Sequence, residues 1–384
     1  MDAINKAVRT SPPNQPLDTD LGLVHRQLAK GYQQPFILLD SDIIHDKVRR
    51  FQRALPRVRP HFAVKANPDQ RVLTLLRNAG VQFEIASKEE LDLLLALKVP
   101  AADIFYSNPI KPAAHVRYAM ENGVQWFVID SLEELHKVYR AGPEAKLYLR
   151  IYTSDRGSCF PLSSKFGAHR EETTAIIQAA AHLGAQLAGV TFHVGSQCSE
   201  LDNWRIALRN AHQVFEQMRS AGLKPNLLNL GGGFPVNLRT VAPTIEQIGK
   251  VINRELSLFP EPITVMAEPG RYLVADAGYF VCQVIGTTRR GNEHWLYLDA
   301  GFYGGLIELK DGLDFELLTD REGPLMPWTI AGPTCDSQDI CAYNQLLPVA
   351  MRAGDFVYIR HAGAYSNACA SRFNGFPLPE VILV

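Results

Sequence analysis

The chain has 384 residues, of which 46% are hydrophobic and 21% charged, and its 39 basic against 40 acidic residues give a formal net charge of −1. This is the balance of an ordinary globular protein, and without a basic excess we expect neither nucleic acid nor an anionic membrane as a partner. No apolar run is long enough to span a bilayer, and the N-terminus lacks the apolar core of a signal peptide.

The cysteines are scattered and show no paired CxxC spacing. This pattern argues against a zinc site and against a disulfide scaffold, so we expect no metal and a reducing, cytoplasmic compartment. The six positions are Cys159, Cys198, Cys282, Cys335, Cys341 and Cys369.

The first 34 residues are polar and include three prolines, so we expect a flexible arm or a short helix there. Segment 35–40, PFILLD, is typical of a strand. From residue 61, short β-rich runs alternate with segments of helical spacing. Ser87 with Glu90, and Ser131 with Glu134, are capping-box signatures at two helix starts. The predicted strands are 61–66, 81–87, 103–109, 124–130, 146–152, 188–196, 226–234 and 263–271.

Eight β-then-α units of this length predict a (β/α)₈ TIM-like barrel. An open doubly wound sheet is the alternative, which the absence of a GxGxxG turn after the first strand makes less favourable. After residue 275 the runs 294–301, 327–333, 355–361 and 379–384 predict strands with few helices between them.

We therefore expect an α/β fold with two domains. The barrel would cover residues 41–275. A β-sandwich or β-barrel domain would combine residues 1–40 and 276–384, with the strand at 35–40 pairing with the C-terminal part.

Polar residues collect where the predicted barrel strands end, which is where such barrels form active sites. These residues are Lys65, Asn67, Glu84, Ser87, Arg150, His193, Ser196, Gly231–Gly233, Glu268, Gly270 and Arg271. A glycine run alone is more often a tight turn than a phosphate site. Its place after the seventh strand, close to Gly270 and Arg271 after the eighth, favours phosphate binding.

Three further residues each allow two interpretations. Lys65, predicted inside an apolar strand, is either an outward-pointing edge residue or an imine-forming amine. His193 is either a core histidine or a ring stacked on a flat cofactor. Glu268 is either an ion-pair partner of Arg271 or the partner of a protonated pyridine nitrogen. Beside a phosphate site, the second interpretations together indicate pyridoxal 5′-phosphate.

From about residue 35 to the end, the chain resembles the pyridoxal-phosphate-dependent ornithine/lysine/arginine decarboxylase family, whose barrel is of the alanine-racemase type. The motifs that carry the resemblance are AVKAN (63–67), YSNPIK (106–111), SSKFG (163–167), FHVGS (192–196), GGGFP (231–235), AEPGR (267–271), GPTCD (332–336), GAY (363–365) and FNGF (373–376).

The resemblance implies cofactor roles. Lys65 would hold the cofactor as a Schiff base, His193 would stack on its ring, and Glu268 would pair with the pyridinium nitrogen. Decarboxylation would pass through a quinonoid intermediate. The other cofactor-binding residues would be Glu84, Arg150, Ser196, Gly232, Gly233, Gly270, Arg271 and Tyr365.

The resemblance also implies a homodimer with shared active sites. Cys335, Asp336 and Phe373 would enter from the partner chain, and Lys165 with Asp339 would bridge the interface. Cys335 would return a proton to Cα, and Asp336 would select a terminal ammonium group. Without the other motifs, Cys335 and Asp336 would be better interpreted as a plain turn, because Gly-Pro-Thr is typical of turns.

The sequence departs from the family pattern at three places. Glu84 stands where the ornithine decarboxylases of higher organisms usually have aspartate, although bacterial relatives tolerate glutamate, and Asn229 stands where an acidic residue is common. The segment after Tyr303 does not align clearly with the family's substrate-binding aspartate, for which Asp311 is the candidate equivalent. The expected reaction is decarboxylation of L-ornithine to putrescine or of L-lysine to cadaverine. The alternatives are a D- or modified diamino acid, an amino-acid racemase, and a non-catalytic regulator of the antizyme-inhibitor type.

Overall fold

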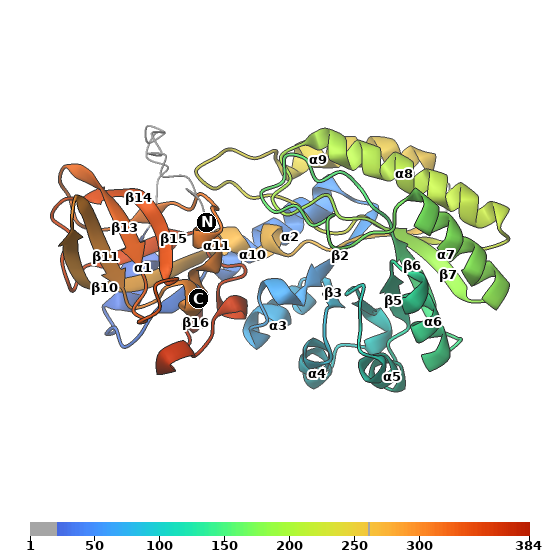
Figure 1. Cartoon of the computed structure of the whole chain (residues 1–384), viewed down its shortest axis with the longest axis horizontal. Helices are drawn as coiled ribbons and strands as arrows, with labels where there is room; N and C mark the ends of the chain where they lie inside the picture. The colour runs from blue at the N-terminus through green and yellow to red at the C-terminus, as the bar shows by residue number, and fades with distance from the viewer. Residues whose placement is uncertain (1–20, 260–261) are drawn as a thin grey trace. The chain divides into compact units, whose positions relative to one another are not determined.

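The structure, a computed structural model, describes residues 21–259 and 262–384 and divides into two units. The larger, the barrel unit, comprises Asp42–Asn237 and Val241–Leu273. The smaller, the sheet unit, takes its described residues from Met1–Ser41, Leu238–Thr240 and Val274–Val384. In Figure 1 the barrel unit runs in colour from blue through green to yellow, and most of the sheet unit is orange.

Eight parallel strands close into a barrel in the larger unit, in the order in which they occur along the chain. This confirms the predicted (β/α)₈ architecture. The strands are β2 (Val58–Ala63), β3 (Gln82–Ile85), β4 (Ile104–Tyr106), β5 (Trp126–Ile129), β6 (Lys146–Arg150), β7 (Gln186–Thr191), β8 (Leu227–Asn229) and β9 (Thr264–Ala267). The last strand closes on the first through the register Val58↔Val265.

Helices follow the strands in the way the alternating pattern predicts (Figure 1). They are α2 (Ser41–Ala54), α3 (Gln70–Asn78), α4 (Lys88–Ala96), α5 (Ala113–Glu121), α6 (Leu132–Ala141), α7 (Arg170–Leu183), α8 (Leu201–Ser220), α9 (Ile245–Glu255) and the short α10 (Arg271–Val274). Because helices cover the outside and side chains fill the inside, the strands are buried on both faces. A cluster of Phe105, Val128, Tyr148, Leu227 and Met266 forms part of the core.

The two predicted helix starts are present, but each capping box is only half formed. The hydroxyls of Ser87 and Ser131 accept the N–H groups of Glu90 and Glu134, both at 3.2 Å. The reciprocal bonds differ from the prediction. Glu90 accepts instead from the N–H of Ala86, and Glu134 is drawn into a buried ion cluster with Lys111 and Lys137.

That ion cluster fixes the loop after β4. Lys111 is fully buried, and its Nζ lies 2.8 Å from Glu134 while it also donates to the carbonyls of Asn108 and Val128. Burial lowers the pKa of Lys111 to about 8. A buried ammonium group is tolerated only with such partners, so the loop that carries Ser107 and Asn108 is held firmly.

In the sheet unit, the strands form one hydrogen-bonded, eight-stranded sheet, which confirms the predicted sheet-rich domain. The strands are β1 (Phe36–Leu39), β10 (Gly278–Arg290), β11 (Glu293–Leu298), β12 (Leu317–Leu318), β13 (Leu325–Ala331), β14 (Ile340–Pro348), β15 (Phe356–Arg360) and β16 (Glu380–Leu383), with helices α1 (Gly22–Leu28) and α11 (Ile307–Lys310). The predicted N-terminal strand, β1, pairs antiparallel with β10 and parallel with β16.

The sequence patterns missed β10, β12 and β14. Strand β10 is the longest of the sheet and pairs with β1, β11 and β15. Its burial changes along its length, from mostly buried near Phe280 to exposed near Arg290, and a register shift falls between Val284 and Gly286. A strand that changes partners and bulges in this way lacks a uniform alternation, so the sequence gives little signal for it.

The predicted N-terminal arm lies mainly outside the described residues, and α1 is the short helix within them. Among residues 21–259 and 262–384, no helix is long and apolar enough to cross a membrane. The same residues contain no group of three or more His, Cys, Asp and Glu side chains that suits a metal ion. All six cysteines lie within the described residues, and none of them forms a disulfide there.

We expect acid to destabilise the barrel through His61. This side chain is buried on β2 against the ring of Phe105, and burial lowers its pKa to about 4. Below about pH 6.5, His61 binds a proton in the unfolded chain but stays neutral in the folded chain. The free energy of unfolding is therefore expected to decrease by about 2–3 kcal/mol as the pH falls from above 6.5 towards 4.

His61→Phe removes this group while keeping an aromatic ring. Urea unfolding followed between pH 7 and pH 4.5 is expected to show a smaller decrease in the free energy of unfolding for the variant. Only the change with pH is compared, because repacking also alters the absolute stability. Parallel curves for the two proteins would contradict the assignment.

Candidate active site

Every barrel strand ends at the same rim, because all eight are parallel and closed on one another. Lys65 lies in a 3₁₀ turn (Val64–Ala66) directly after β2, Glu84 on β3, and Arg150 at the end of β6. His193 and Ser196 follow β7, Gly231–Gly233 follow β8, and Glu268, Gly270 and Arg271 follow β9. The barrel therefore gathers the polar residues that the sequence singled out at strand ends.

Lys65 differs from its predicted environment. The strand ends at Ala63, and the turn that follows leaves the Lys65 side chain 49% exposed rather than buried in a strand. Its ammonium group pairs with the carboxylate of Glu84, whose side chain is 1% exposed. Burial raises the pKa of Glu84, and the Lys65 charge opposes that rise. An amine at the rim, beside a buried carboxylate, is placed to react and to exchange protons.

Glu268 is held by neutral donors. Its Oε1 accepts hydrogen bonds from Ser107 Oγ and from Asn229 Nδ2, each at 2.6 Å. Ser107 Oγ also lies 2.6 Å from the Tyr148 hydroxyl. The sequence interpretation singled out Glu268 but not these three neighbours. Ser107 lay inside the YSNPIK motif and Asn229 had been noted as a departure, whereas Tyr148 gave no signal because it is an inward residue of an ordinary strand.

His193 carries a neutral imidazole. Its Nδ1 accepts the N–H of Gly195 at 3.0 Å, which requires that nitrogen to be unprotonated. The same state follows from its surroundings. Burial, then the positive charges of Arg150 and Lys65, lower the pKa of His193 to about 3. Burial also lowers the pKa of Arg150, and the charge of Glu268 opposes this decrease.

The glycine run is sterically required. A Cβ on Gly231, at φ +62°, would stand 2.0 Å from the carbonyl oxygen of Phe192, and one on Gly233, at φ +100°, would stand 2.4 Å from that of Gly195. A Cβ on Gly232 would meet His193 Nε2 at 2.9 Å. The loops after β7 and β8 are thus pressed together, and only bare backbone fits between them.

Gln197 ties these two loops and was missed from the sequence. It is buried, and its amide exchanges two hydrogen bonds with the backbone of Val236, at 3.0 and 2.7 Å. Its φ of +54° is unusual for a residue with a side chain. The N–H of Cys198 adds a bond to the carbonyl of Gly233 at 3.0 Å. These contacts fix the strained turn next to Ser196.

The rim fits the cofactor that the motifs imply. Among the described residues, no hydrogen bond uses the N–H groups of Gly232 and Gly233, and backbone N–H groups of this kind suit a phosphate. Within the described part of the chain the Ser196 hydroxyl has no hydrogen-bond partner, so it can donate to a ligand. Lys65 supplies a reachable amine for an aldehyde, and Glu268 supplies a fixed carboxylate for a ring nitrogen.

The sheet unit brings together a second group of predicted residues. Asp336 accepts from the hydroxyl of Tyr303 at 2.5 Å and from the N–H of Gln338 at 2.9 Å. The ring of Phe373, 41% exposed, lies 4.3 Å from that of Tyr303 between centroids.

Cys335, next to Asp336, is exposed, and its Sγ accepts from Asn374 Nδ2 at 3.1 Å. Cys335, Asp336 and Phe373 therefore form one cluster through Tyr303 and Asn374, neither of which the sequence interpretation had assigned. Asn374 lay within the FNGF motif, and Tyr303 lay in the segment that did not align clearly.

Three other predicted residues of this unit lie outside the cluster of Cys335, Asp336 and Phe373. Asp311 caps the C-terminus of α11 and is exposed, and among the described residues no hydrogen bond joins it to the cluster. Tyr365 lies after β15 with a left-handed φ of +58°. Asp339, predicted to face a partner chain, is 2% exposed, and its oxygens accept from the N–H of Phe302 and from the N–H and hydroxyl of Thr334.

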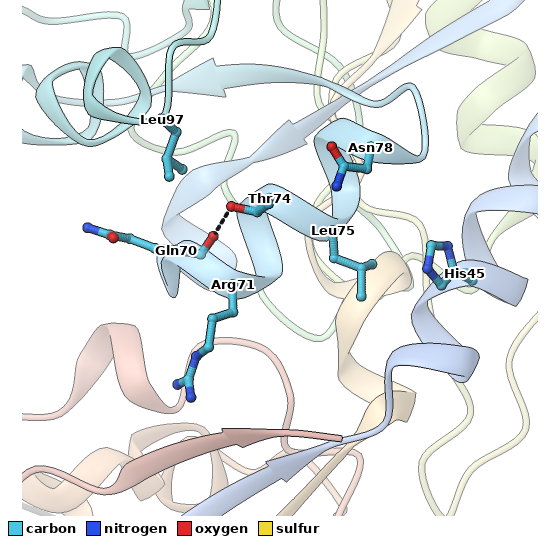
Figure 2. Close-up of a pocket in the computed structure, with 7 residues that line it drawn as sticks. All are labelled: His45, Gln70, Arg71, Thr74, Leu75, Asn78 and Leu97. Atoms are coloured by element: carbon cyan, nitrogen blue, oxygen red, sulfur yellow. Dashed lines mark hydrogen bonds between the residues drawn. The ribbon is translucent and has the colours of Figure 1, made fainter.

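A separate pocket of about 510 Å³ lies on the helices around the barrel, not at the strand ends (Figure 2). It is lined by His45, Gln70, Arg71, Thr74, Leu75, Asn78 and Leu97. Most of these residues belong to α3, and none is a predicted site residue. The barrel rim, where the buried charges meet, is therefore the candidate active site.

Comparisons with known proteins identify the family of the chain. The sequence profile of a family described as pyridoxal-dependent decarboxylase, pyridoxal binding domain, matches residues 41–275. The lysine/ornithine decarboxylase of Selenomonas ruminantium is 34% identical over 364 residues, which cover 93% of this chain and 91% of that protein. Antizyme inhibitor 2 of Xenopus laevis is 36% identical over 363 residues, covering 89% and 79% of the two chains.

Solved structures match both units. The crystal structure of a lysine/ornithine decarboxylase from Vibrio vulnificus, complexed with cadaverine, has a TM-score of 0.87 at 36% identity. The match covers 95% of this chain and 98% of that one. The family expected from the motifs is thereby confirmed: the chain belongs to the pyridoxal-dependent decarboxylases, and it is an amino-acid decarboxylase that uses pyridoxal 5′-phosphate.

Proposed function

We propose that this enzyme decarboxylates a basic diamino acid, L-ornithine or L-lysine, and releases putrescine or cadaverine. The observation that carries the substrate class is Asp336, a partly exposed carboxylate held in place by Tyr303 and Gln338 beside the thiol of Cys335. A fixed carboxylate suits a terminal ammonium group. The relatives' names support this, since one is called lysine/ornithine decarboxylase and another was solved with cadaverine.

Bound pyridoxal phosphate supplies an electron sink for the electron pair left on Cα when CO₂ leaves. In our proposal Lys65 binds the cofactor's aldehyde, the neutral ring of His193 packs on its flat face, and Glu268 faces its ring nitrogen. The remaining cofactor-binding residues are Glu84, Arg150, Ser196, Gly232, Gly233, Gly270, Arg271 and Tyr365. The buried charges and the bare glycine loop at the rim support these roles.

Cys335 is the proposed acid that returns a proton to Cα. Its thiol is exposed, and the hydrogen bond from Asn374 fixes the position of Sγ. Phe373, against Tyr303, would contact the methylene chain of the substrate. Asp311 stays a prediction as a second carboxylate for the substrate, because no described contact ties it to this cluster.

We also propose a homodimer in which Cys335, Asp336 and Phe373 of one chain complete the site around Lys65 of the other. These three residues belong to the sheet unit, whereas Lys65 belongs to the barrel unit. Six cysteines that form no disulfide among the described residues fit the proposed cytoplasmic location, where the environment is reducing.

The site residues disfavour two other functions, a non-catalytic regulator and a racemase. A regulator like antizyme inhibitor 2 needs no reactive amine, yet here Lys65 stands at the rim beside Glu84. By resemblance, a racemase on this barrel places an arginine at the pyridine nitrogen, whereas Glu268 favours a strong electron sink. The alternative substrates are a D-amino acid or a modified diamino acid, and the assay below therefore includes both enantiomers of each amino acid.

The proposal is tested by incubating the purified protein, loaded with pyridoxal phosphate, with L- and D-forms of ornithine, lysine, arginine and diaminopimelate. Mass spectrometry of the amines is expected to detect putrescine from L-ornithine, cadaverine from L-lysine, or both. Product from only a D-amino acid or only diaminopimelate would contradict the proposed substrate, and no amine at all would contradict catalysis of this class.

Asp336→Ala is expected to raise KM for ornithine and lysine roughly tenfold or more, because a charge-assisted bond is worth about 1.5–3 kcal/mol. Initial rates over a range of substrate concentrations measure the effect. Asp311→Ala, an acidic residue outside the cluster, is the matched variant. An unchanged KM in Asp336→Ala together with a raised KM in Asp311→Ala would move the ammonium site to Asp311.

The shared site predicts complementation. Lys65→Ala and Cys335→Ala chains, each with little activity alone, should regain up to about a quarter of wild-type activity when subunits exchange at random, because half the dimers are mixed and each mixed dimer has one intact site. Exchange is checked with differently tagged chains. Proven exchange without recovery would show that each site is built from one chain.

A further inference from the structure

The Glu268 carboxylate ends a directed chain of hydrogen bonds. Ser107 Oγ donates to Glu268 Oε1, and its distance to the Tyr148 hydroxyl is also 2.6 Å. A serine hydroxyl has one hydrogen to donate, so Tyr148 must be the donor in the second bond. Burial raises the pKa of Tyr148 well above its ordinary value. The phenol therefore keeps its proton and can donate it in the hydrogen bond to Ser107 Oγ.

Asn229 donates to the same oxygen of Glu268. Its Nδ2 donates to Glu268 Oε1 at 2.6 Å, while its Oδ1 accepts the N–H of Gly231 at 2.9 Å. The carbonyl of Gly231 in turn accepts the N–H of Glu268 at 2.8 Å. Asn229 is fully buried. Its amide thus links the carboxylate to the glycine loop, and both ends of the amide are committed.

The two oxygens of Glu268 are used differently. Oε1 takes both hydrogen bonds, and no hydrogen bond from the described residues reaches Oε2. Both donors are neutral, so they orient the carboxylate without cancelling its charge. A lysine or arginine in their place would neutralise it, and an ionised aspartate at position 229 would have no hydrogen to donate.

We propose that Ser107, backed by Tyr148, and Asn229 are positioning residues of the cofactor site. They hold Glu268 by Oε1 so that Oε2 faces the ring nitrogen of pyridoxal phosphate. Asn229 also sets the position of this carboxylate relative to the Gly231–Gly233 loop, which would hold the phosphate. The inference rests on the proposed role of Glu268, and its test separates the two.

The test compares two ligands that differ at one atom: pyridoxal phosphate and its analogue with a carbon in place of the ring nitrogen. Quenching of tryptophan fluorescence gives the equilibrium dissociation constant of each for the full chain. Ser107→Ala is expected to weaken pyridoxal phosphate about tenfold, the value of one hydrogen bond to a charged group, and to leave the analogue unchanged. The analogue has no nitrogen for Glu268 to meet.

Two variants serve as controls for Ser107. Ser107→Thr keeps the hydroxyl and should keep the wild-type ratio of the two constants. Ser257→Ala removes an exposed hydroxyl that bonds the carbonyl of Arg254 at 2.8 Å, and neither constant should change. If Ser107→Ala weakens both ligands alike, or neither, Ser107 has no positioning role.

Asn229→Ala is expected to weaken both ligands, and pyridoxal phosphate more, because Asn229 also holds the N–H of Gly231. Unchanged binding of the analogue would contradict the link to the glycine loop. Glu268→Ala tests the underlying assignment and should weaken pyridoxal phosphate alone. If Glu268→Ala does not distinguish the ligands, the role of Glu268 is wrong; if it does and Ser107→Ala does not, only the positioning role is wrong.

Discussion

Closure of eight parallel strands into a barrel is the constraint on which the site depends. Once the strands are parallel and closed, each must end at the same rim. Residues as far apart along the chain as Lys65 and Glu268 then share one small volume. The rim is where backbone N–H groups and side chains no longer serve the sheet, so it can carry charged groups that the apolar interior would reject.

Each titratable group at the rim has a different kind of partner. Glu84 is paired with an ammonium group, Glu268 accepts from two neutral donors, and His193 is a neutral imidazole. The two glutamates thus have different surroundings: one lies beside a half-exposed amine, and the other is held by two hydrogen bonds. Such division of roles by environment is how an active site assigns its acids and bases.

Steric requirements link this electrostatic frame to the backbone. Gly231 has no room for a side chain, and its peptide group accepts from Glu268 and donates to Asn229. The glycine loop, the carboxylate and the turn that carries His193 are therefore linked by direct contacts. A second cluster, around Asp336 and Tyr303, is built in the same way in the sheet unit, with a hydroxyl fixing a carboxylate.

The sequence by itself determined the barrel, the family and the positions of Lys65, His193 and Glu268, because strand periodicity and motifs at strand ends are local properties of the chain. Only the tertiary structure decided which side chains meet. The half-exposed turn at Lys65, the donors Ser107, Tyr148 and Asn229, and the bridge made by Gln197 depend on contacts between strands or loops distant in sequence. A hydrogen bond across a barrel produces no repeating pattern of residues along the chain, so it cannot be predicted from a single sequence.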